Sequence, residues 1–235
     1  MTHTNWPNNI QIGNATSLDA GLYGSVAPSS RRLHHISKRA FDVLASGSAL
    51  LFLSPLLLLL YFLVKSDGGD ALFGHKRIGR NGRSFACLKF RSMVPNAGEV
   101  LAKLLAENPE AARTWAETRK LQNDPRVTRI GKFLRSTSLD ELPQLVNVLR
   151  GEMSLVGPRP VVQEELTQHY GAAAASYMAV RPGITGLWQI SGRSDTSYAE
   201  RVALDSRYVR EFSFWTDLRI LVKTVPAVLF GRGAY

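Results

Sequence analysis

Ser138-Leu139-Asp140-Glu141-Leu142-Pro143-Gln144-Leu145 is the stretch from which the chain is best interpreted, because two adjacent carboxylates stand at the start of a predicted short helix. Apolar residues follow at helical spacing: Leu142, Leu145, Val146 and Leu149. Gly151 predicts the end of this helix. Adjacent side chains on a helix point about 100° apart, so we expect Asp140 and Glu141 to have different roles, one facing a substrate and the other holding a metal or a base position.

Arginines are dense on both sides of the carboxylate pair. They are Arg126, Arg129, Arg135, Arg150, Arg159, Arg181 and Arg193. Guanidinium groups pair with phosphates, so this composition indicates a site for a multiply charged anion, most simply a phosphate ester. A structural alternative needs no site: Ser138 and Glu141 have the spacing of a capping box, and acids in a first helical turn complement the helix dipole.

Basic residues outnumber acidic ones by 29 to 19, which gives a formal net charge of +10. This excess suits nucleic acid, an anionic membrane or phosphorylated substrates, and does not choose among them. Cys87 is the single cysteine, so an internal disulfide and a cysteine-based metal site are excluded, and we expect a reduced thiol in the cytoplasm. The histidines lack the spacing of a zinc site.

The segment from Phe41 to Val64 is apolar apart from Asp42. As a helix it reaches about 36 Å, enough to cross a hydrocarbon core of roughly 30 Å, so a spanning helix is the simplest interpretation. Ser54-Pro55 in its middle predicts a kink, because proline removes a backbone donor and clashes with the preceding turn.

Basic residues flank this apolar segment on both sides, whereas a spanning helix normally keeps them on the cytoplasmic side only. They are Arg31, Arg32, Lys38 and Arg39 before it, and Lys65, Lys76, Arg77, Arg80 and Arg83 after it. We therefore favour a re-entrant segment over residues 36–66 that leaves the membrane on the side it entered, and keep a spanning helix as the alternative. The polar residues before it predict a disordered tail over 1–35.

A hairpin is predicted at Gly79-Arg80-Asn81-Gly82, since Asn-Gly favours a tight turn. The alternation that follows from Ser84 to Met93 predicts a strand with Cys87, Lys89 and Arg91 on one face. Two cations on one strand face can grip a phosphate or can form a solvated edge, and the spacing does not decide between these.

Helices are predicted over 97–120, with an interruption at Pro109, and over 198–212 and 213–230. The segment 124–129 predicts a loop or short strand. Prolines stiffen the loops that carry Arg159 and Arg181, which makes a phosphate contact more plausible than a structural role for this pair. The last helix groups apolar residues beside Arg219 and Lys223, as expected either at a membrane interface or in a core.

Several motifs run in order along residues 36–235 and carry a specific likeness. They are Lys38-Arg39-Ala40-Phe41-Asp42, Ser54-Pro55, Arg77-Ile78-Gly79-Arg80-Asn81-Gly82, Lys89-Phe90-Arg91-Ser92-Met93, Asp124-Pro125-Arg126-Val127-Thr128, Ser138-Leu139-Asp140-Glu141-Leu142-Pro143-Gln144, Met153-Ser154-Leu155-Val156-Gly157-Pro158-Arg159-Pro160 and Arg181-Pro182-Gly183-Ile184-Thr185-Gly186-Leu187-Trp188-Gln189. On these residues the chain resembles the bacterial sugar transferases, monotopic phosphoglycosyltransferases that start polysaccharide assembly on polyprenyl phosphate.

The resemblance implies a helix-dominated α+β fold. A re-entrant helix bent at Ser54 and Pro55 would anchor a compact cytoplasmic catalytic domain over residues 67–235, with short strands and interfacial helices. The protein would lie on the cytoplasmic face of the bacterial inner membrane, in contact with its lipids. A homodimer and downstream glycosyltransferases are further partners that fit this expectation.

The resemblance also implies a reaction: Mg²⁺-dependent transfer of hexose 1-phosphate, with galactose or glucose as the sugar, from a UDP-sugar to undecaprenyl phosphate. Asp140 would be the nucleophile that forms a phosphoryl-aspartate and expels UMP, and Glu141 would help to hold Mg²⁺. Phosphate contacts are expected from Lys89, Arg91, Arg126, Arg159 and Arg181. The product would start an exopolysaccharide repeat unit.

Two other classes of function remain as alternatives. A basic, membrane-anchored adaptor without activity would explain the charge and the apolar segment, but it would leave the Asp140–Glu141 pair without a role. A nucleic-acid binder is disfavoured, because the chain has a membrane segment and no recognisable binding motif.

Overall fold

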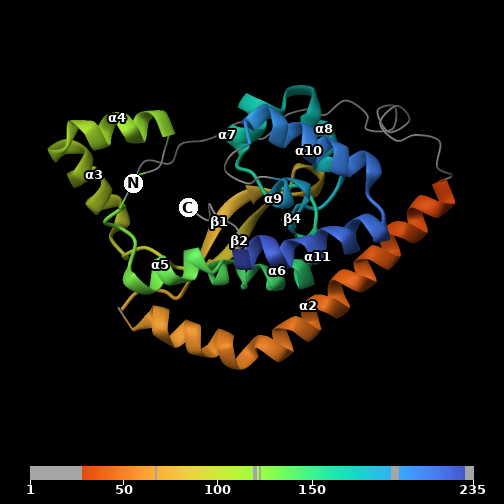
Figure 1. Cartoon of the computed structure of the whole chain (residues 1–235), viewed down its shortest axis with the longest axis horizontal. Helices are drawn as coiled ribbons and strands as arrows, with labels where there is room; N and C mark the ends of the chain where they lie inside the picture. The colour runs from red at the N-terminus through yellow and green to blue at the C-terminus, as the bar shows by residue number, and fades with distance from the viewer. Residues whose placement is uncertain (1–27, 67, 119–120, 122, 192–195, 231–235) are drawn as a thin grey trace.

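The computed structural model describes residues 28–66, 68–118, 121, 123–191 and 196–230. Helices dominate it, as predicted, and the strands are short. β1 (Leu72–Ile78) and β2 (Ser84–Phe90) form an antiparallel hairpin, while β3 (Ser154–Val156) and β4 (Gly183–Thr185) form a parallel pair. Figure 1 shows the hairpin at the centre, α11 (Phe214–Phe230) and α6 (Gln144–Arg150) beside it, and the long helix α2 (Pro28–Lys65) running beneath them.

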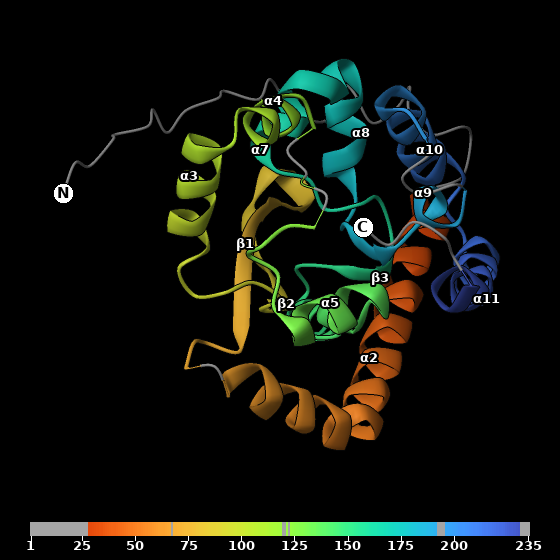
Figure 2. The same cartoon turned by 60° about the vertical axis from the view of Figure 1, so that its left-hand side comes forward.

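Helix α2 contains the apolar segment from Phe41 to Val64; it begins at Pro28, before the predicted boundary at residue 36, and ends at Lys65, one residue before the predicted boundary at residue 66. Residues 1–27 of the predicted tail lie outside the described residues. The helix changes direction partway along its length (Figure 2). Pro55 cannot donate to the carbonyl of Leu51, and the Ser54 hydroxyl donates to that carbonyl instead, at 2.8 Å. In this Ser-Pro pair, proline removes a backbone donor and the serine hydroxyl replaces it.

Buried polar contacts fix the first half of α2 to the rest of the protein. Lys38 forms an ion pair with Asp217 of α11, and its ammonium also donates to the carbonyl of Val156 at 3.0 Å. The Tyr208 hydroxyl, from α10 (Tyr198–Glu211), donates to Asp217 Oδ1 at 2.8 Å. The Lys38–Asp217 pair therefore links α2 to α10, α11 and β3.

The next two charged residues of α2 extend this attachment. Arg39 donates to the carbonyls of Val148 and Leu149, at the end of α6, at 2.6 and 2.9 Å. Asp42 is 2% exposed and accepts a hydrogen bond from the amide of Leu155 at 3.1 Å. The helix is thus attached to the rest of the protein by the motif Lys38-Arg39-Ala40-Phe41-Asp42, which forms the base of the helix.

The second half of α2 returns to the same body of the protein. Leu60 and Val64 are buried against Ala71, Phe90 and Leu134. Between the two attached ends, the large side chains face outward: Leu51, Phe52, Leu58, Leu59, Phe62 and Leu63. An apolar surface is therefore exposed in the middle of a helix whose two ends both pack on one domain.

The predicted hairpin is confirmed, with Ile78 opposite Ser84 and a short 3₁₀ turn η1 (Arg80–Gly82) between the strands. Asn81 and Gly82 both have positive φ, 58° and 73°, as an Asn-Gly turn requires. On β2, Phe85 and Cys87 are buried, and alternation places Lys89 on their face.

The predicted break at Pro109 is also confirmed, between α3 (Ala97–Glu107) and α4 (Pro109–Thr118). The prediction of only a loop or short strand at 124–129 is incomplete. Val127 does bridge to Met93, but the helix α5 (Arg129–Ser136) follows at once. Thr128 caps it by accepting a hydrogen bond from the amide of Gly131 at 2.9 Å, a signal that sequence reasoning missed.

The remaining short elements surround the β3–β4 pair. They are α7 (Gln163–Glu165), the π-helix η3 (Leu166–Tyr170), η4 (Gly171–Ala173), α8 (Ala174–Ala179) and α9 (Leu187–Ile190). Two predicted loops lie here: Arg159 follows β3, and Arg181 precedes β4.

Helix α11 buries Asp217 and Ile220, whereas most of its predicted apolar face is exposed: Phe214, Trp215, Leu218, Val222 and Val225. Core packing is therefore the wrong interpretation for these five residues. The rings of Phe214 and Phe41 lie 5.8 Å apart, so the exposed face of α11 adjoins α2. This arrangement favours the membrane-interface interpretation.

The ion pair between Lys38 and Asp217 predicts a large stability effect. Lys38→Met leaves the Asp217 carboxylate buried without its partner and should lower the free energy of unfolding in detergent by about 3 kcal/mol. Lys38→Met/Asp217→Leu should recover part of this loss, because both charges are gone. Lys103→Met removes an exposed pair with Glu107 and should change stability by less than about 1 kcal/mol. Equal effects of the two lysine substitutions, measured by denaturant unfolding, would contradict this role.

Candidate active site

Lys89 joins the two predicted carboxylates. Its ammonium lies 2.6 Å from Glu141 Oε1 and 3.6 Å from Asp140 Oδ2. The lysine comes from the end of β2, and the carboxylates come from the 3₁₀ turn η2 (Leu139–Glu141). Asp140 is buried, with 8% exposure, whereas the Glu141 side chain is about one third exposed at 35%. The pair is thus asymmetric, as the different roles predicted for adjacent residues require.

The capping-box interpretation of Ser138 and Glu141 is wrong. Ser138 is in the left-handed region at φ 57°, and its side chain makes no capping hydrogen bond. The Glu141 carboxylate accepts a hydrogen bond from Lys89. A contact with a distant strand has therefore replaced the local contact that the spacing suggested.

The predicted helix after the carboxylates also needs correction. α6 begins at Gln144, and Gly151 ends it at φ 81°, as predicted. Leu149, assigned to the apolar face, is 37% exposed, while Asn147 and Val148 are fully buried. The helix is therefore rotated from the predicted orientation, and a polar side chain enters the interior.

Asn147 explains this rotation and was missed by sequence reasoning. Its Oδ1 accepts a hydrogen bond from the amide of Leu88 at 2.9 Å, and its Nδ2 donates to the carbonyl of Ala86 at 2.8 Å and to Glu152 Oε2 at 2.6 Å. The side-chain amide thereby fixes β2, and with it Lys89, to the helix that follows the carboxylates. The available signal was an asparagine inside an apolar helical run, since buried amides are usually hydrogen-bonded.

Close packing of α5 on the end of β2 places η2 beside Lys89. A Cβ at Gly131 would lie 2.0 Å from the carbonyl oxygen of Ser92, so only glycine permits this approach. Arg135 Nε donates to the Ser92 hydroxyl at 2.8 Å. The chain then continues directly from α5 into the carboxylate pair.

Charges in the site act on the protonation of Asp140 and Lys89. Burial, and next the charge of Glu141, raise the pKa of Asp140, although Lys89 and Arg135 oppose the shift. Burial lowers the pKa of Lys89, but Glu141 and Asp140 outweigh it, so the net shift is upward even though Arg159 opposes it. Lys89 is therefore held as a cation, and the Asp140 carboxylate is kept in a weakly solvated environment.

Arg159 is presented by a stacked and hydrogen-bonded support. Its guanidinium lies 4.9 Å from the ring centroid of Trp188, which also carries the guanidinium of Arg201 at 4.2 Å. The carboxylate of Asp205, which is 2% exposed, accepts hydrogen bonds from the amide of Arg159 and from the Tyr170 hydroxyl at 2.7 Å. Asp205 is a second residue that sequence reasoning missed, and a polar helical pattern gives no sign of its burial.

Two other predicted phosphate contacts have protein partners in this structure. Arg126 is buried, pairs with Asp124 at 2.6 Å and stacks on Trp115 at 4.8 Å. Arg91 donates to the carbonyls of Asp70, Met93 and Val64 at 2.7, 2.7 and 2.9 Å. These contacts hold loops in place, so a phosphate role for either arginine would require an exchange of partners.

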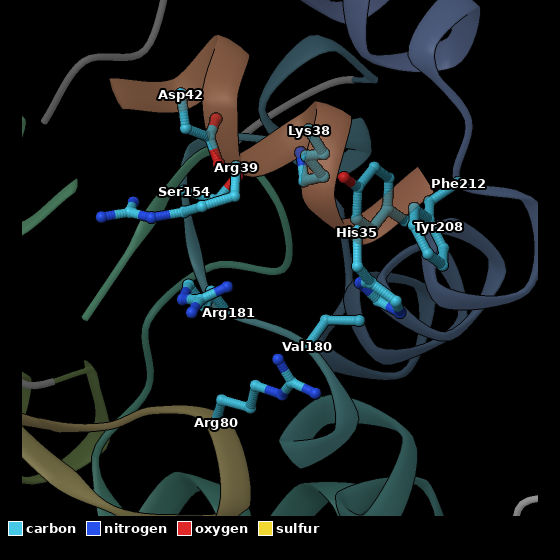
Figure 3. A pocket seen from close by; sticks show the side chains of 10 residues that line it. All are labelled: His35, Lys38, Arg39, Asp42, Arg80, Ser154, Val180, Arg181, Tyr208 and Phe212. Carbon is cyan, nitrogen blue, oxygen red and sulfur yellow. The ribbon is translucent and has the colours of Figure 1, made fainter. Parts of the chain in front are cut away.

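The remaining arginines of the predicted cluster are dispersed. Arg181 donates to the carbonyl of Gly151 at 2.7 Å and lines a separate cavity with Arg39 and Arg80 (Figure 3). Arg129 and Arg150 are exposed, and Arg193 lies outside the described residues. The part of the anion site that the structure brings together is therefore Lys89, Arg135 and Arg159 around the carboxylates.

Few described side chains near the carboxylate pair could bind a metal ion. Among the residues that the structure describes, no group of three or more His, Cys, Asp or Glu side chains could hold one. Mg²⁺ commonly binds one or two carboxylates together with substrate phosphates and water. The partly exposed Glu141 carboxylate beside Asp140 fits that mode, in which the substrate would complete the coordination.

Comparison with known proteins relates this geometry to one family. The family described as bacterial sugar transferase matches residues 33–231. The exopolysaccharide production protein ExoY of Rhizobium meliloti is 58% identical over 206 residues, which cover 87% of this chain and 91% of that protein. An undecaprenyl-phosphate galactose phosphotransferase of Salmonella typhimurium is 51% identical over 88% of this chain and 43% of its own length. A UDP-glucose:undecaprenyl-phosphate glucose-1-phosphate transferase of Caulobacter vibrioides is 39% identical over 96% of this chain and 81% of its own length.

Asp205 predicts a pH dependence of stability. Burial raises the pKa of Asp205 to about 6 from an ordinary value of 3.8, against the hydrogen bonds from Tyr170 and Arg159. Between these values the folded state keeps a proton that the unfolded chain has released, so the stability that this group contributes falls as the pH rises. From pH 4 to pH 7 the wild type should lose about 2 kcal/mol relative to Asp205→Asn.

Unfolding in detergent at pH 4, 5, 6 and 7 measures this difference. Tyr170→Phe removes a hydrogen bond to the charged carboxylate and should extend the fall to higher pH. Parallel pH profiles of the wild type and Asp205→Asn would show that the carboxylate does not titrate as described.

Proposed function

The chain belongs to the bacterial sugar transferase family, and on this premise we propose that it transfers a hexose 1-phosphate from a UDP-sugar to undecaprenyl phosphate. The observation that carries the proposal is the Asp140–Glu141 pair, bridged by Lys89, in a domain attached to both ends of an apolar helix. The relatives' names give galactose or glucose as the transferred sugar. Either hexose 1-phosphate would begin a repeat unit of an exopolysaccharide.

The donor's diphosphate would bind beside the carboxylates. Lys89 is a cation between Asp140 and Glu141, and Arg159 is close enough to oppose its protonation. Both can donate to phosphoryl oxygens, and Arg159 reaches the site on a guanidinium already oriented by Trp188. Positive groups held in place reduce the repulsion between a carboxylate and a phosphoryl centre.

Asp140 would act as the nucleophile. One of its oxygens forms a bond to the sugar-linked phosphorus, and the bond between that phosphorus and the bridging oxygen breaks to release UMP. The product is a sugar-phosphoryl aspartate. An oxygen of undecaprenyl phosphate then attacks the same phosphorus, which restores the Asp140 carboxylate and gives the sugar diphosphate of the lipid. A soluble donor and a membrane acceptor can thereby use one site in turn.

Glu141 would hold Mg²⁺ together with donor phosphate oxygens and water, since two adjacent carboxylates and a substrate diphosphate suit this ion. When bound, Mg²⁺ supplies positive charge that neutralises the phosphoryl oxygens. Lys89 now occupies the space between the carboxylates and would move toward the phosphates as the substrate enters. The mobile lysine stem permits this exchange.

Helix α2 would be re-entrant and would place the site at the cytoplasmic face of the inner membrane. The support is that Lys38 and Val64, near opposite ends of the helix, both contact the same domain, while the bulky apolar side chains between them are exposed. The bend with its Ser54–Leu51 hydrogen bond allows such a path. The exposed face of α11 would lie in the interface beside it.

Asp140→Asn tests the reaction. Purified protein in detergent receives Mg²⁺, undecaprenyl phosphate and a panel of UDP-sugars, and UMP release is measured. We expect release with one sugar from the wild type, and a loss of roughly 1,000-fold or more in Asp140→Asn, because an amide cannot form the acyl phosphate. Burial raises the pKa of Asp140, so the neutral amide should not unfold the protein.

Asp70→Asn makes the same chemical change at an exposed position and should retain release. Wild-type rates in Asp140→Asn would exclude the aspartate as nucleophile. A folded wild-type protein that releases no UMP with any donor would favour the adaptor interpretation.

Cysteine labelling tests the topology. Ala40→Cys and Ser66→Cys place thiols at exposed positions on either side of the apolar segment, and native Cys87 should react little, because burial raises its pKa to about 11. With a membrane-impermeant maleimide, we expect neither position to react in intact spheroplasts and both to react after lysis. Labelling of one position in intact spheroplasts would establish a spanning helix.

A further inference from the structure

A cavity lies at the opposite end of α6 from the carboxylate pair. Its empty volume, including the open mouth, is about 380 Å³. Figure 3 shows Arg80 and Arg181 beside one another at the cavity, with His35 to one side. The helix α6 is about 10 Å long at 1.5 Å per residue; Glu141 precedes its first residue and Gly151 follows its last, so the length of this helix separates the two places. The cavity is therefore separate from the proposed reaction centre.

Three arginines from distant parts of the chain meet here. Arg39 belongs to α2, Arg80 to the hairpin turn and Arg181 to the loop before β4. Arg39 uses both terminal nitrogens on the last carbonyls of α6, and Arg181 uses Nε on the carbonyl of Gly151. Both terminal nitrogens of Arg39 therefore have acceptors. These bonds leave the terminal nitrogens of Arg181 and the whole guanidinium of Arg80 without an acceptor among the described residues.

The acidic residue of the cavity does not neutralise this cluster. Asp42 is 2% exposed, and its Oδ1 accepts a hydrogen bond from the amide of Leu155. Burial, followed by the charges of Arg39 and Arg80, lowers the pKa of Arg181 despite the opposing effect of Asp42. Guanidiniums that line one cavity repel one another unless an anion lies between them, and their planar donor groups suit the oxygens of a phosphate.

We propose that this cavity binds a phosphate-type oxyanion, carried by a soluble phosphate ester or by an anionic lipid headgroup. Its oxygens accept from the terminal nitrogens of Arg181 and from Arg80. The bound anion connects the hairpin turn and the loop before β4, and its charge offsets that of Arg39 on α2. Its occupancy therefore stabilises the folded state without contributing an atom to the transfer reaction.

Thermal unfolding of the full chain in detergent tests the site, with inorganic phosphate replacing chloride at constant ionic strength. We expect a saturable rise in the unfolding temperature of the wild type. Arg80→Gln should raise the half-saturating phosphate concentration by about tenfold, because it removes one charge-assisted contact. Arg83→Gln removes an exposed arginine of the same hairpin that does not line the cavity and should match the wild type.

Lys89→Gln separates this site from the proposed reaction centre. We expect phosphate to stabilise Lys89→Gln as it does the wild type, since Lys89 lies at the other end of α6. A phosphate effect that is lost in Lys89→Gln and kept in Arg80→Gln would place the anion at the carboxylate pair and overturn the proposal. An unfolding temperature of the wild type that does not respond to phosphate would also overturn it.

Nanodiscs distinguish the two carriers. If the headgroup is the occupant, phosphatidylglycerol should remove the phosphate response of the wild type, and phosphatidylcholine alone should preserve it. If a soluble ester is the occupant, the response should be the same in both lipids. Either pattern supports the site only when Arg80→Gln weakens the response.

Discussion

The buried ion pair between Lys38 and Asp217 is the contact on which the arrangement of this protein depends. The second half of α2 is attached by apolar contacts, which are non-directional, so the polar contacts of its first half set the direction of the helix. Lys38 provides them by meeting an acid of α11 and a carbonyl of β3, while Tyr208 orients the same acid. Because an isolated charge could not be buried here, the helix base and the domain are fixed as one unit.

The same kind of constraint organises the candidate site at a smaller scale. Lys89 and the two carboxylates come from segments about 50 residues apart in sequence, and nothing local holds them together. The amide of Asn147 fixes the strand, and Gly131 lets α5 approach the end of that strand. Asp205 and Trp188 do the corresponding work for Arg159. The groups of the candidate site are thus positioned by residues to which the proposed reaction gives no chemical step.

Local sequence signals predicted what depends on local chemistry. The Asn-Gly turn, the break at Pro109, the helix end at Gly151 and the bend-forming Ser54-Pro55 pair each follow from backbone geometry. The carboxylate pair was selected as a candidate site from its sequence setting, and the structure places Lys89 beside both groups. Local sequence patterns gave wrong predictions where contacts between distant segments decide the structure. Ser138 and Glu141 have the spacing of a capping box, but Glu141 accepts a hydrogen bond from Lys89 of β2 instead. The hydrogen bonds of Asn147 to β2 bury a different face of α6 from the apolar face that the sequence predicted. Local sequence patterns carry no information about which distant residues will form hydrogen bonds in the folded protein.

Asn147 has a consequence for how copies of this protein can meet. One edge of β2 pairs with β1, and the other presents the Leu88 amide and the Ala86 carbonyl. Exposed strand edges are templates for intermolecular sheet growth. Here a side-chain amide bonds to both backbone groups and imitates a neighbouring strand. A second copy cannot extend the hairpin at this edge without first displacing α6, so any association between copies has to use another surface.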